Sequence, residues 1–263
     1  MHSNPNSDFP AIKRLFGISG CVAMVTGGRR GLGLAMSEGL ASAGAKLACI
    51  DIADECNELR NRVEAHGTEL AYFQADLADR SQRNGLVDRV VERFGRLDIL
   101  VNCAGIQHRQ PAMEFDLERW DTIISLMLTA VFELSQQAAR VMERQGGGKI
   151  INIASLCSFQ GGWTIPAYTA VKSGVAGLTK ALANEWAVKN IHVNAIAPGY
   201  FDTEMCAAII NDPVREPKIR ERIPAGRWGK PEELVGPLLF LASDASNYVD
   251  GHVLLVDGGW MGR

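Results

Sequence analysis

Short apolar segments alternate with longer amphipathic segments along most of the chain. Each short segment is a continuous apolar run bounded by glycine or polar residues, which is typical of a strand buried on both faces. Each longer segment repeats apolar residues at intervals of three and four, which predicts a helix with one buried stripe. The predicted strands are residues 21–26, 46–50, 70–75, 99–103, 149–154, 191–197 and 252–256. The predicted helices are residues 31–45, 81–94, 117–145, 168–188 and 231–242.

This alternation predicts an α/β fold: a single Rossmann-type, doubly wound parallel sheet of about seven strands with helices on both faces. One domain is expected over residues 17–263, preceded by a flexible extension over residues 1–16. Residues 200–225 are the least regular stretch because they contain Pro213, Pro217 and Pro224. This stretch is therefore a candidate for a mobile flap over a site.

The composition argues against a protein that binds nucleic acid, spans a membrane, is secreted or holds a metal. The chain has 263 residues, with 27 Lys and Arg against 30 Asp and Glu, and this balance gives no general attraction to nucleic acid or anionic membranes. No apolar run is long enough for a membrane span, and the polar start disfavours a secretory signal. The six cysteines predict free thiols in a reducing cytoplasm, and the five histidines form no cluster with acids, so no metal site is predicted.

A glycine-rich turn joins the first predicted strand to the first predicted helix. Residues 26–33 read TGGRRGLG, and Gly27, Gly31 and Gly33 allow the backbone to turn tightly and approach a phosphate. The helix that begins near Gly31 offers free N–H groups and the positive end of its dipole to a pyrophosphate. Strand, glycine turn and helix in this order predict a dinucleotide site.

Asp51 follows the second predicted strand, eighteen residues after Gly33. A carboxylate there can bind both ribose hydroxyls of a dinucleotide and repel a 2′-phosphate, which favours NAD over NADP. Arg29 and Arg30 favour NADP instead, because a guanidinium could neutralise the added phosphate. We expect NAD, with NADP as the alternative.

Ser155 follows the fifth predicted strand, and Tyr168 and Lys172 share one face of a predicted helix. An ammonium close to a phenol lowers the pKa of the phenol, so Tyr168 could remove a proton from an alcohol while hydride leaves the carbon. The Ser155 hydroxyl would hydrogen-bond the same substrate oxygen. The tyrosine–lysine spacing alone is common by chance, but with the serine and the glycine turn it indicates an enzyme that interconverts alcohols and ketones.

These motifs together resemble the short-chain dehydrogenase/reductase family over residues 17–263. The resemblance implies a homotetramer, and it implies that Lys172 also binds the nicotinamide ribose. It is carried by the glycine turn, by Asn102-Cys103-Ala104-Gly105, by Ser155 with Tyr168 and Lys172, by Pro198-Gly199 and by Asp257-Gly258-Gly259. The cofactor-binding residues it implies are Thr26, Gly27, Arg30, Gly31, Leu32, Gly33, Asp51, Ile52, Asp76, Leu77, Asn102, Ala104, Gly105, Tyr168, Lys172, Pro198, Gly199, Phe201 and Thr203.

Within the family, residues 153–162, 184–186, 194–200, 223–229 and 257–260 resemble the sugar-acid dehydrogenases. The implied reaction is a reversible, NAD-dependent oxidation of a secondary alcohol on a sugar acid such as 2-dehydro-3-deoxy-D-gluconate. The substrate is expected outside the carboxyl ends of the strands. The candidate contacts are His108, Arg109 and Gln160 for the acid, with Trp163 and Met205 as apolar walls.

Two positions depart from the family pattern. Cys103 replaces an asparagine, and Met127 stands where the family's catalytic asparagine falls. That asparagine helps to hold a water in a proton relay, largely through its main-chain carbonyl, which methionine retains while losing the amide. Two other functions therefore remain open: a 3-oxoacyl-thioester or other carbonyl reductase on the same fold, and a catalytically impaired dinucleotide-binding protein.

Overall fold

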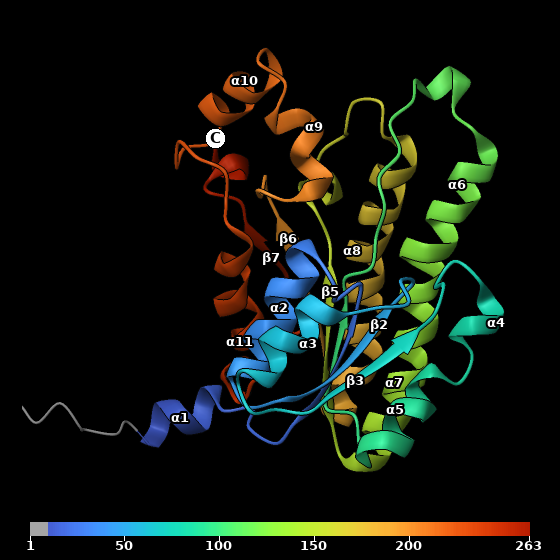
Figure 1. Cartoon of the computed structure of the whole chain (residues 1–263), viewed down its shortest axis with the longest axis vertical. Coiled ribbons are helices and arrows are strands. Elements are labelled where there is room, and N and C mark those ends of the chain that lie inside the picture. The colour runs from blue at the N-terminus through green and yellow to red at the C-terminus, as the bar shows by residue number, and fades with distance from the viewer. Residues whose placement is uncertain (1–9) are drawn as a thin grey trace, which may run out of the picture.

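The computed structural model describes residues 10–263, which form a seven-stranded sheet in the order β3-β2-β1-β4-β5-β6-β7 (Figure 1). Every pairing of neighbouring strands is parallel. The predicted Rossmann-type parallel sheet is confirmed. The strands are β1 (Val22–Thr26), β2 (Lys46–Asp51), β3 (Leu70–Gln74), β4 (Ile99–Asn102), β5 (Gly148–Ile153), β6 (Ile191–Pro198) and β7 (Val253–Val256).

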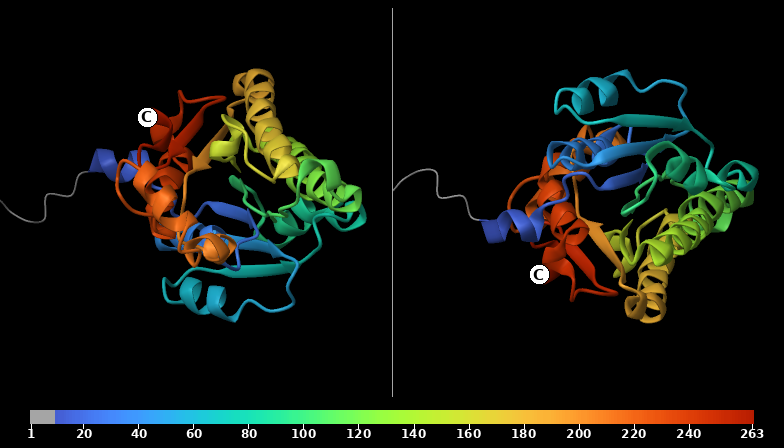
Figure 2. Two further views of the ribbon diagram at one scale, coloured as in Figure 1. Left: turned by 90° about the horizontal axis from the view of Figure 1, so that it is seen from above. Right: turned by 90° about the horizontal axis from the view of Figure 1, so that it is seen from below.

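Helices cover both faces of the sheet, as the views from above and below show (Figure 2). One layer consists of α2 (Gly31–Ser42), α3 (Asn57–Glu64) and α11 (Val235–Ala242). The other consists of α5 (Leu86–Phe94), α7 (Ala130–Gln145) and α8 (Pro166–Trp186).

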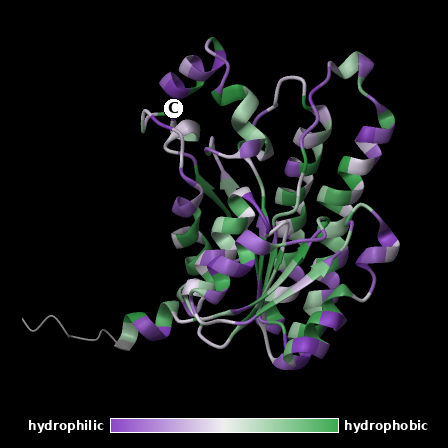
Figure 3. Cartoon of the chain, in the orientation of Figure 1, coloured by the Kyte–Doolittle hydropathy of each residue, from purple (hydrophilic) through white to green (hydrophobic). Residues whose placement is uncertain are grey.

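Alternating side chains of the strands build a separate core on each face. In β1, Ala23 and Val25 pack into the core beneath α2, while Val22 and Met24 pack into the core beneath α7. This is the two-residue period of a strand that is buried on both sides. Hydrophobic residues accordingly fill the strands and the inner helix faces, and hydrophilic residues occupy much of the outer faces (Figure 3).

Two long helices predicted from periodicity are interrupted. The first divides into α4 (Arg80–Arg83) and α5, because Gly85 adopts a φ of 72° between them. Asp79 caps α4 by accepting a hydrogen bond from the Ser81 amide. The second divides into α6 (Leu117–Ile124), a π-helical turn η2 (Ser125–Thr129) and α7. Helix α3 was not among the predicted helices.

Residues 200–225 are more regular than predicted. They contain the short helices η5 (Glu204–Cys206), α9 (Ala207–Ile210) and α10 (Arg215–Arg222). In Figure 1, α9 and α10 lie at the upper left of the molecule and α6 at the upper right. The remaining 3-10 helices are η1 (Ala112–Glu114), η3 (Leu156–Ser158), η4 (Ala187–Lys189), η6 (Pro231–Leu234), η7 (Asp244–Ser246) and η8 (Trp260–Gly262).

The predicted N-terminal extension is only partly within the described residues. Positions 1–9 lie outside them, and α1 (Pro10–Phe16) gives the rest of the extension helical structure. None of the helices formed by residues 10–263 combines the length and apolarity that a membrane span needs. Over the same residues, no group of three or more His, Cys, Asp or Glu side chains is placed to hold a metal ion. All six cysteines are free thiols.

Candidate active site

The glycine turn forms a cradle that side chains would fill. Gly27 and Gly31 adopt φ values of 67° and 55°, in the left-handed region that favours glycine. A Cβ on Gly27 would lie 2.8 Å from the Ala104 Cα, and a Cβ on Gly33 would overlap the Gly27 carbonyl oxygen. The turn therefore lies against the loop after β4, and only a bare backbone fits there.

The amino end of α2 is open to an anion. Arg30 is the N-cap residue, no side chain within residues 10–263 caps this end, and Gly31 and Leu32 occupy the first turn of a 12-residue helix. Uncapped amide groups and the helix dipole favour a pyrophosphate at this position. The glycine cradle and this uncapped helix end together fit a dinucleotide.

Thr26 and Asn102 organise the loop after β4. Thr26 Oγ1 accepts the backbone N–H groups of Cys103 at 3.0 Å and Ala104 at 3.1 Å. Asn102 Nδ2 donates to Asn152 Oδ1 at 2.9 Å, while its own Oδ1 is buried and finds no hydrogen-bond partner among residues 10–263. The polar side chains thus hold the loop in place beside the cradle.

Asp51 lies at the carboxyl end of β2, and its side chain is only 12% exposed. One of its oxygens accepts the Ala53 amide at 3.3 Å and lies 3.8 Å from Arg29 Nε. Arg30 pairs with Glu204 of η5 at 3.2 Å. Both arginines that favour NADP in the sequence therefore already face a carboxylate.

The other predicted cofactor residues lie around the same edge of the sheet. Asp76 Oδ1 accepts the Ala78 amide at 2.8 Å, so residues 76–78 form a tight turn in which Leu77 is buried. Ile52, beside Asp51, is exposed.

The segment after β6 closes against the glycine turn. A Cβ on Gly199 would lie 2.7 Å from the Asp257 Cα, which shows that Pro198 and Gly199 pass close to the C-terminal turn. Phe201 is buried and pairs with Gly229. Thr203 lies 4.0 Å from the place where a Cβ on Gly31 would stand.

The structure brings Ser155, Tyr168 and Lys172 together. Ser155 caps η3, where its Oγ accepts the Cys157 amide at 3.1 Å. Tyr168 and Lys172 lie one turn apart on α8, and Lys172 Nζ lies 5.6 Å from the centre of the Tyr168 ring. Lys172 Nζ also donates to the Ile153 carbonyl oxygen at 2.5 Å.

Burial dominates the electrostatics of this cluster. It raises the pKa of Tyr168, and a hydrogen bond with the Ser155 side chain acts in the opposite direction. Burial also lowers the pKa of Lys172, to about 8. The site thus contains a phenol and a buried amine, each in an environment that disfavours its charged form.

Met127 packs beneath the loop after β4. It is 2% exposed and belongs to the π-helical turn η2. The Ile106 amide donates to Met127 Sδ at 3.4 Å, and a Cβ on Gly105 would lie 2.9 Å from Met127 Cε. The methionine therefore fills the space between η2 and this loop.

Two of the candidate substrate residues bond to other side chains. His108 Nε2 lies 3.1 Å from Gln110 Oε1, and its ring packs edge-on against Phe115. Gln160 Oε1 accepts the indole N–H of Trp260 at 3.3 Å. Trp163 and Met205 are exposed, at 81% and 48%.

Arg109 is held less firmly than His108 and Gln160. Its guanidinium donates to the Trp163 carbonyl at 3.5 Å and forms no ion pair within residues 10–263. Burial lowers the pKa of Arg109, and the positive charge of Arg215 lowers it further. Sequence reasoning missed Arg215, because α10 has no buried residue and so carries no apolar stripe.

Comparisons with known proteins cover nearly the whole chain. The family model described as enoyl-(acyl carrier protein) reductase matches residues 27–261. The chain is 49% identical over 253 residues to the 2-dehydro-3-deoxy-D-gluconate 5-dehydrogenase of Dickeya dadantii (strain 3937), covering 96% of this chain and 100% of that protein. It is 42% identical over 249 residues to the gluconate 5-dehydrogenase of Gluconobacter oxydans (strain 621H), covering 93% and 96%. The crystal structure of a gluconate 5-dehydrogenase from Burkholderia cenocepacia J2315, in complex with NADP and tartrate, matches with a TM-score of 0.91 at 40% identity, covering 96% and 99%.

Proposed function

Because the chain belongs to the short-chain dehydrogenase/reductase family, we propose that it interconverts a secondary alcohol and a ketone on a sugar acid such as 2-dehydro-3-deoxy-D-gluconate. The observation that carries the proposal is the cluster of Ser155, Tyr168 and Lys172 in a chain that matches sugar-acid dehydrogenases along its length. The cluster supplies the acid–base chemistry, and the relatives indicate the substrate class.

In the oxidation direction, Tyr168 Oη removes the hydroxyl proton of the substrate, and Ser155 Oγ hydrogen-bonds the same oxygen. Since burial raises the pKa of Tyr168, the base needs a nearby positive charge. The Lys172 amine, 5.6 Å from the centre of the Tyr168 ring, is the group that would supply it when protonated. A dinucleotide bound along this edge supplies the hydride acceptor. The residues that would hold it are those of the glycine cradle, the α2 amino end, Asp51 and the turn at residues 76–78.

NAD is the dinucleotide in this proposal. Its support is the Asp51 carboxylate, which is largely buried at the end of β2 and would face a 2′-phosphate. Arg29 and Arg30, which would otherwise attract that phosphate, are each paired with a carboxylate. The Burkholderia enzyme was solved with NADP, so the proposed preference depends on these three residues of this chain.

The reaction is tested by following NADH absorbance with a panel of hexonates, deoxyhexonates and their keto forms. We expect turnover with at least one acidic sugar and none with neutral hexoses. Turnover of an acetoacetyl thioester without any turnover of sugar acids would replace the proposal with the thioester reductase. Absence of turnover throughout the panel, with dinucleotide binding intact, would favour the impaired protein that Met127 suggests.

Replacing Arg109 with alanine is expected to raise the KM for the acidic substrate by about 10- to 100-fold, because a charge-assisted bond to a carboxylate is worth roughly 1.5–3 kcal/mol. Its guanidinium has no anionic partner in the described chain, so a substrate carboxylate would be its partner. Steady-state kinetics on the acid and on its neutral lactone or polyol analogue measure the effect. Arg119→Ala, on an exposed part of α6, is the control. An equal rise for acid and neutral analogue would contradict the assignment.

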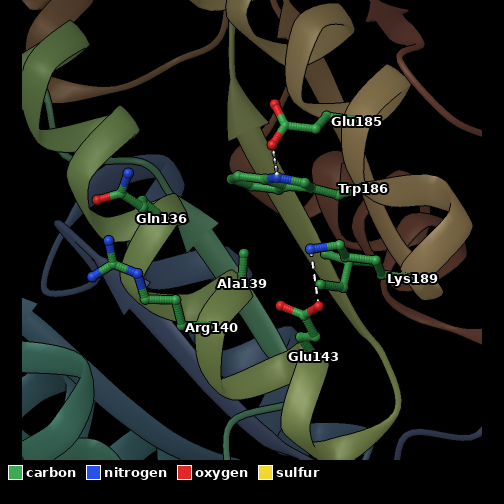
Figure 4. Close-up of a pocket in the computed structure, with 8 residues that line it drawn as sticks. Gln136, Ala139, Arg140, Glu143, Glu185, Trp186 and Lys189 are labelled. Carbon is green, nitrogen blue, oxygen red and sulfur yellow. Dashed lines mark hydrogen bonds and ion pairs between the residues drawn. The ribbon is translucent and has the colours of Figure 1, made fainter.

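The proposed assembly is a homotetramer in the cytoplasm. Its support is the outer surface formed by α7 and α8, which the family resemblance places at an interface. A groove of about 160 Å³ separates the two helices, with Arg140 and Glu143 on one side and Trp186 and Lys189 on the other (Figure 4). Phe132 of α7 is 40% exposed. Six free cysteines fit a reducing compartment.

A further inference from the structure

Arg83 is buried to 2% exposure in a position that no catalytic role explains. Its Nη1 donates to the carbonyl oxygens of Leu77 at 2.6 Å and Ala78 at 3.2 Å, and to Ser125 Oγ at 3.1 Å. Its Nε pairs with Glu133 of α7 at 2.6 Å. One guanidinium therefore binds the turn after β3, the start of the π-helical turn and α7.

Ser125 strengthens the same junction. Its hydroxyl donates to the Ala78 carbonyl at 2.7 Å, so the turn after β3 is bonded to η2 directly as well as through Arg83. The same π-helical turn contains Met127, whose sulfur accepts the Ile106 amide in the loop after β4. A continuous set of contacts thus runs from the turn at residues 76–78 to the loop beside the glycine cradle.

A buried guanidinium holds its neighbours in place. An unpaired charge in the interior is costly, so the carbonyls of Leu77 and Ala78 and the Glu133 carboxylate cannot move away from Arg83 without a large penalty. Glu133 also pairs with Arg80 at 2.9 Å, but the Arg80 side chain is 83% exposed and is not bonded to the turn. Arg83 therefore fixes the turn, whereas Arg80 only adds a surface ion pair.

We propose that Arg83 is a positioning residue that ties the dinucleotide-binding turn at residues 76–78 to the π-helical turn at residues 125–129. Loss of Arg83 then releases Asp76 and Leu77, the residues implied to contact adenine, and loosens the packing of η2 under the loop after β4. Weaker binding of the adenine half of the dinucleotide and slower turnover follow from the same change. The inference depends on the proposed function only in requiring a dinucleotide.

Calorimetry with AMP and with nicotinamide mononucleotide tests this role without requiring turnover. For Arg83→Met we expect the Kd of AMP to rise about tenfold, as for other changes within coupled networks, and the Kd of the mononucleotide to change less than about twofold. With the sugar acid as substrate, the KM for NAD should rise and kcat should fall. An equal loss of affinity for AMP and for the mononucleotide, or no loss of affinity for AMP, would overturn the proposal.

Two further variants separate positioning from general stability. Arg80→Met removes the exposed partner of Glu133 and should leave both affinities unchanged. If Arg83→Met does not fold, Ser125→Ala tests the proposal instead. It removes the direct hydrogen bond to the Ala78 carbonyl, so it should weaken the binding of AMP and leave the binding of the mononucleotide unchanged. A selective loss of AMP affinity in a chain that turns over no sugar acid would support the role of Arg83 while refuting the proposed substrate.

Discussion

Tyr168→Phe is expected to lower kcat for sugar-acid oxidation by about 10²- to 10⁴-fold, the range that general acid–base catalysis supplies. The variant loses a single oxygen, the one that would take the substrate proton. Because the ring remains, its packing with Lys172 and the surrounding core should persist. Stopped-flow and steady-state measurements of NADH formation give kcat, and NAD titration by calorimetry shows whether the cofactor still binds.

The chain offers a matched control for this change. Tyr248 is fully exposed, so Tyr248→Phe removes the same oxygen where it contacts no substrate, and kcat should not change. Retention of more than about a tenth of the wild-type kcat by Tyr168→Phe would contradict its role as the proton acceptor. Recovery of the wild-type kcat by Tyr168→Phe at saturating NAD would also contradict it, because the missing oxygen would then serve only to bind the cofactor.

The strands were predictable because helices cover both faces of the sheet, so each strand is a nearly continuous apolar run. Residues 191–197 form a continuous apolar run apart from His192 and Asn194, and β6 is buried at each of its positions. Its observed bounds differ from the prediction by one residue. Burial on two faces makes most residues of the strand apolar, so the run stands out in the sequence despite the two buried polar side chains.

Helix interruptions were not predictable from the same signal. The apolar stripe continues through residues 117–145, although η2 inserts a π-helical turn at Ser125–Thr129. That turn is associated with contacts to distant segments, such as the bonds of Ser125 to Ala78 and of Met127 to Ile106. Periodicity describes which face is buried and does not report a local change of hydrogen-bond pattern.

In the candidate site too, local relations between residues were predictable and long-range relations were not. Tyr168 and Lys172 were paired from their spacing because one helix turn fixes their relation. The bond between Gln160 and Trp260 joins residues 100 positions apart, and the influence of Arg215 on Arg109 joins the start of α10 to the loop after β4. These long-range interactions depend on how the C-terminal segments pass over the ends of the strands. A local sequence pattern does not predict that arrangement.

Asp51→Ser is expected to shift the ratio of kcat/KM for NAD over NADP by about 100-fold towards NADP. A carboxylate and a phosphate charge about 4–5 Å apart repel each other by roughly 3–4 kcal/mol at an effective dielectric of 20, and each 1.36 kcal/mol corresponds to a factor of ten. Part of this gain is offset because serine keeps one hydrogen bond to the ribose. Initial rates with each dinucleotide at saturating sugar acid give the ratio. Asp54→Ser, an exposed carboxylate in the same loop, is the control.

The effect should have two components that a double variant can separate. Removing Asp51 abolishes the repulsion, and it also frees Arg29, whose buried Nε lies 3.8 Å from that carboxylate and has no hydrogen-bond partner in the described part of the chain. A freed guanidinium can bind the 2′-phosphate through charge-assisted bonds. The double variant Asp51→Ser, Arg29→Met should therefore show the same lowered kcat/KM for NAD as Asp51→Ser alone. It should lose much of the NADP affinity that Asp51→Ser gains. If the ratio in Asp51→Ser stays at the wild-type value, the carboxylate does not select the dinucleotide, and the preference must arise elsewhere along the cradle.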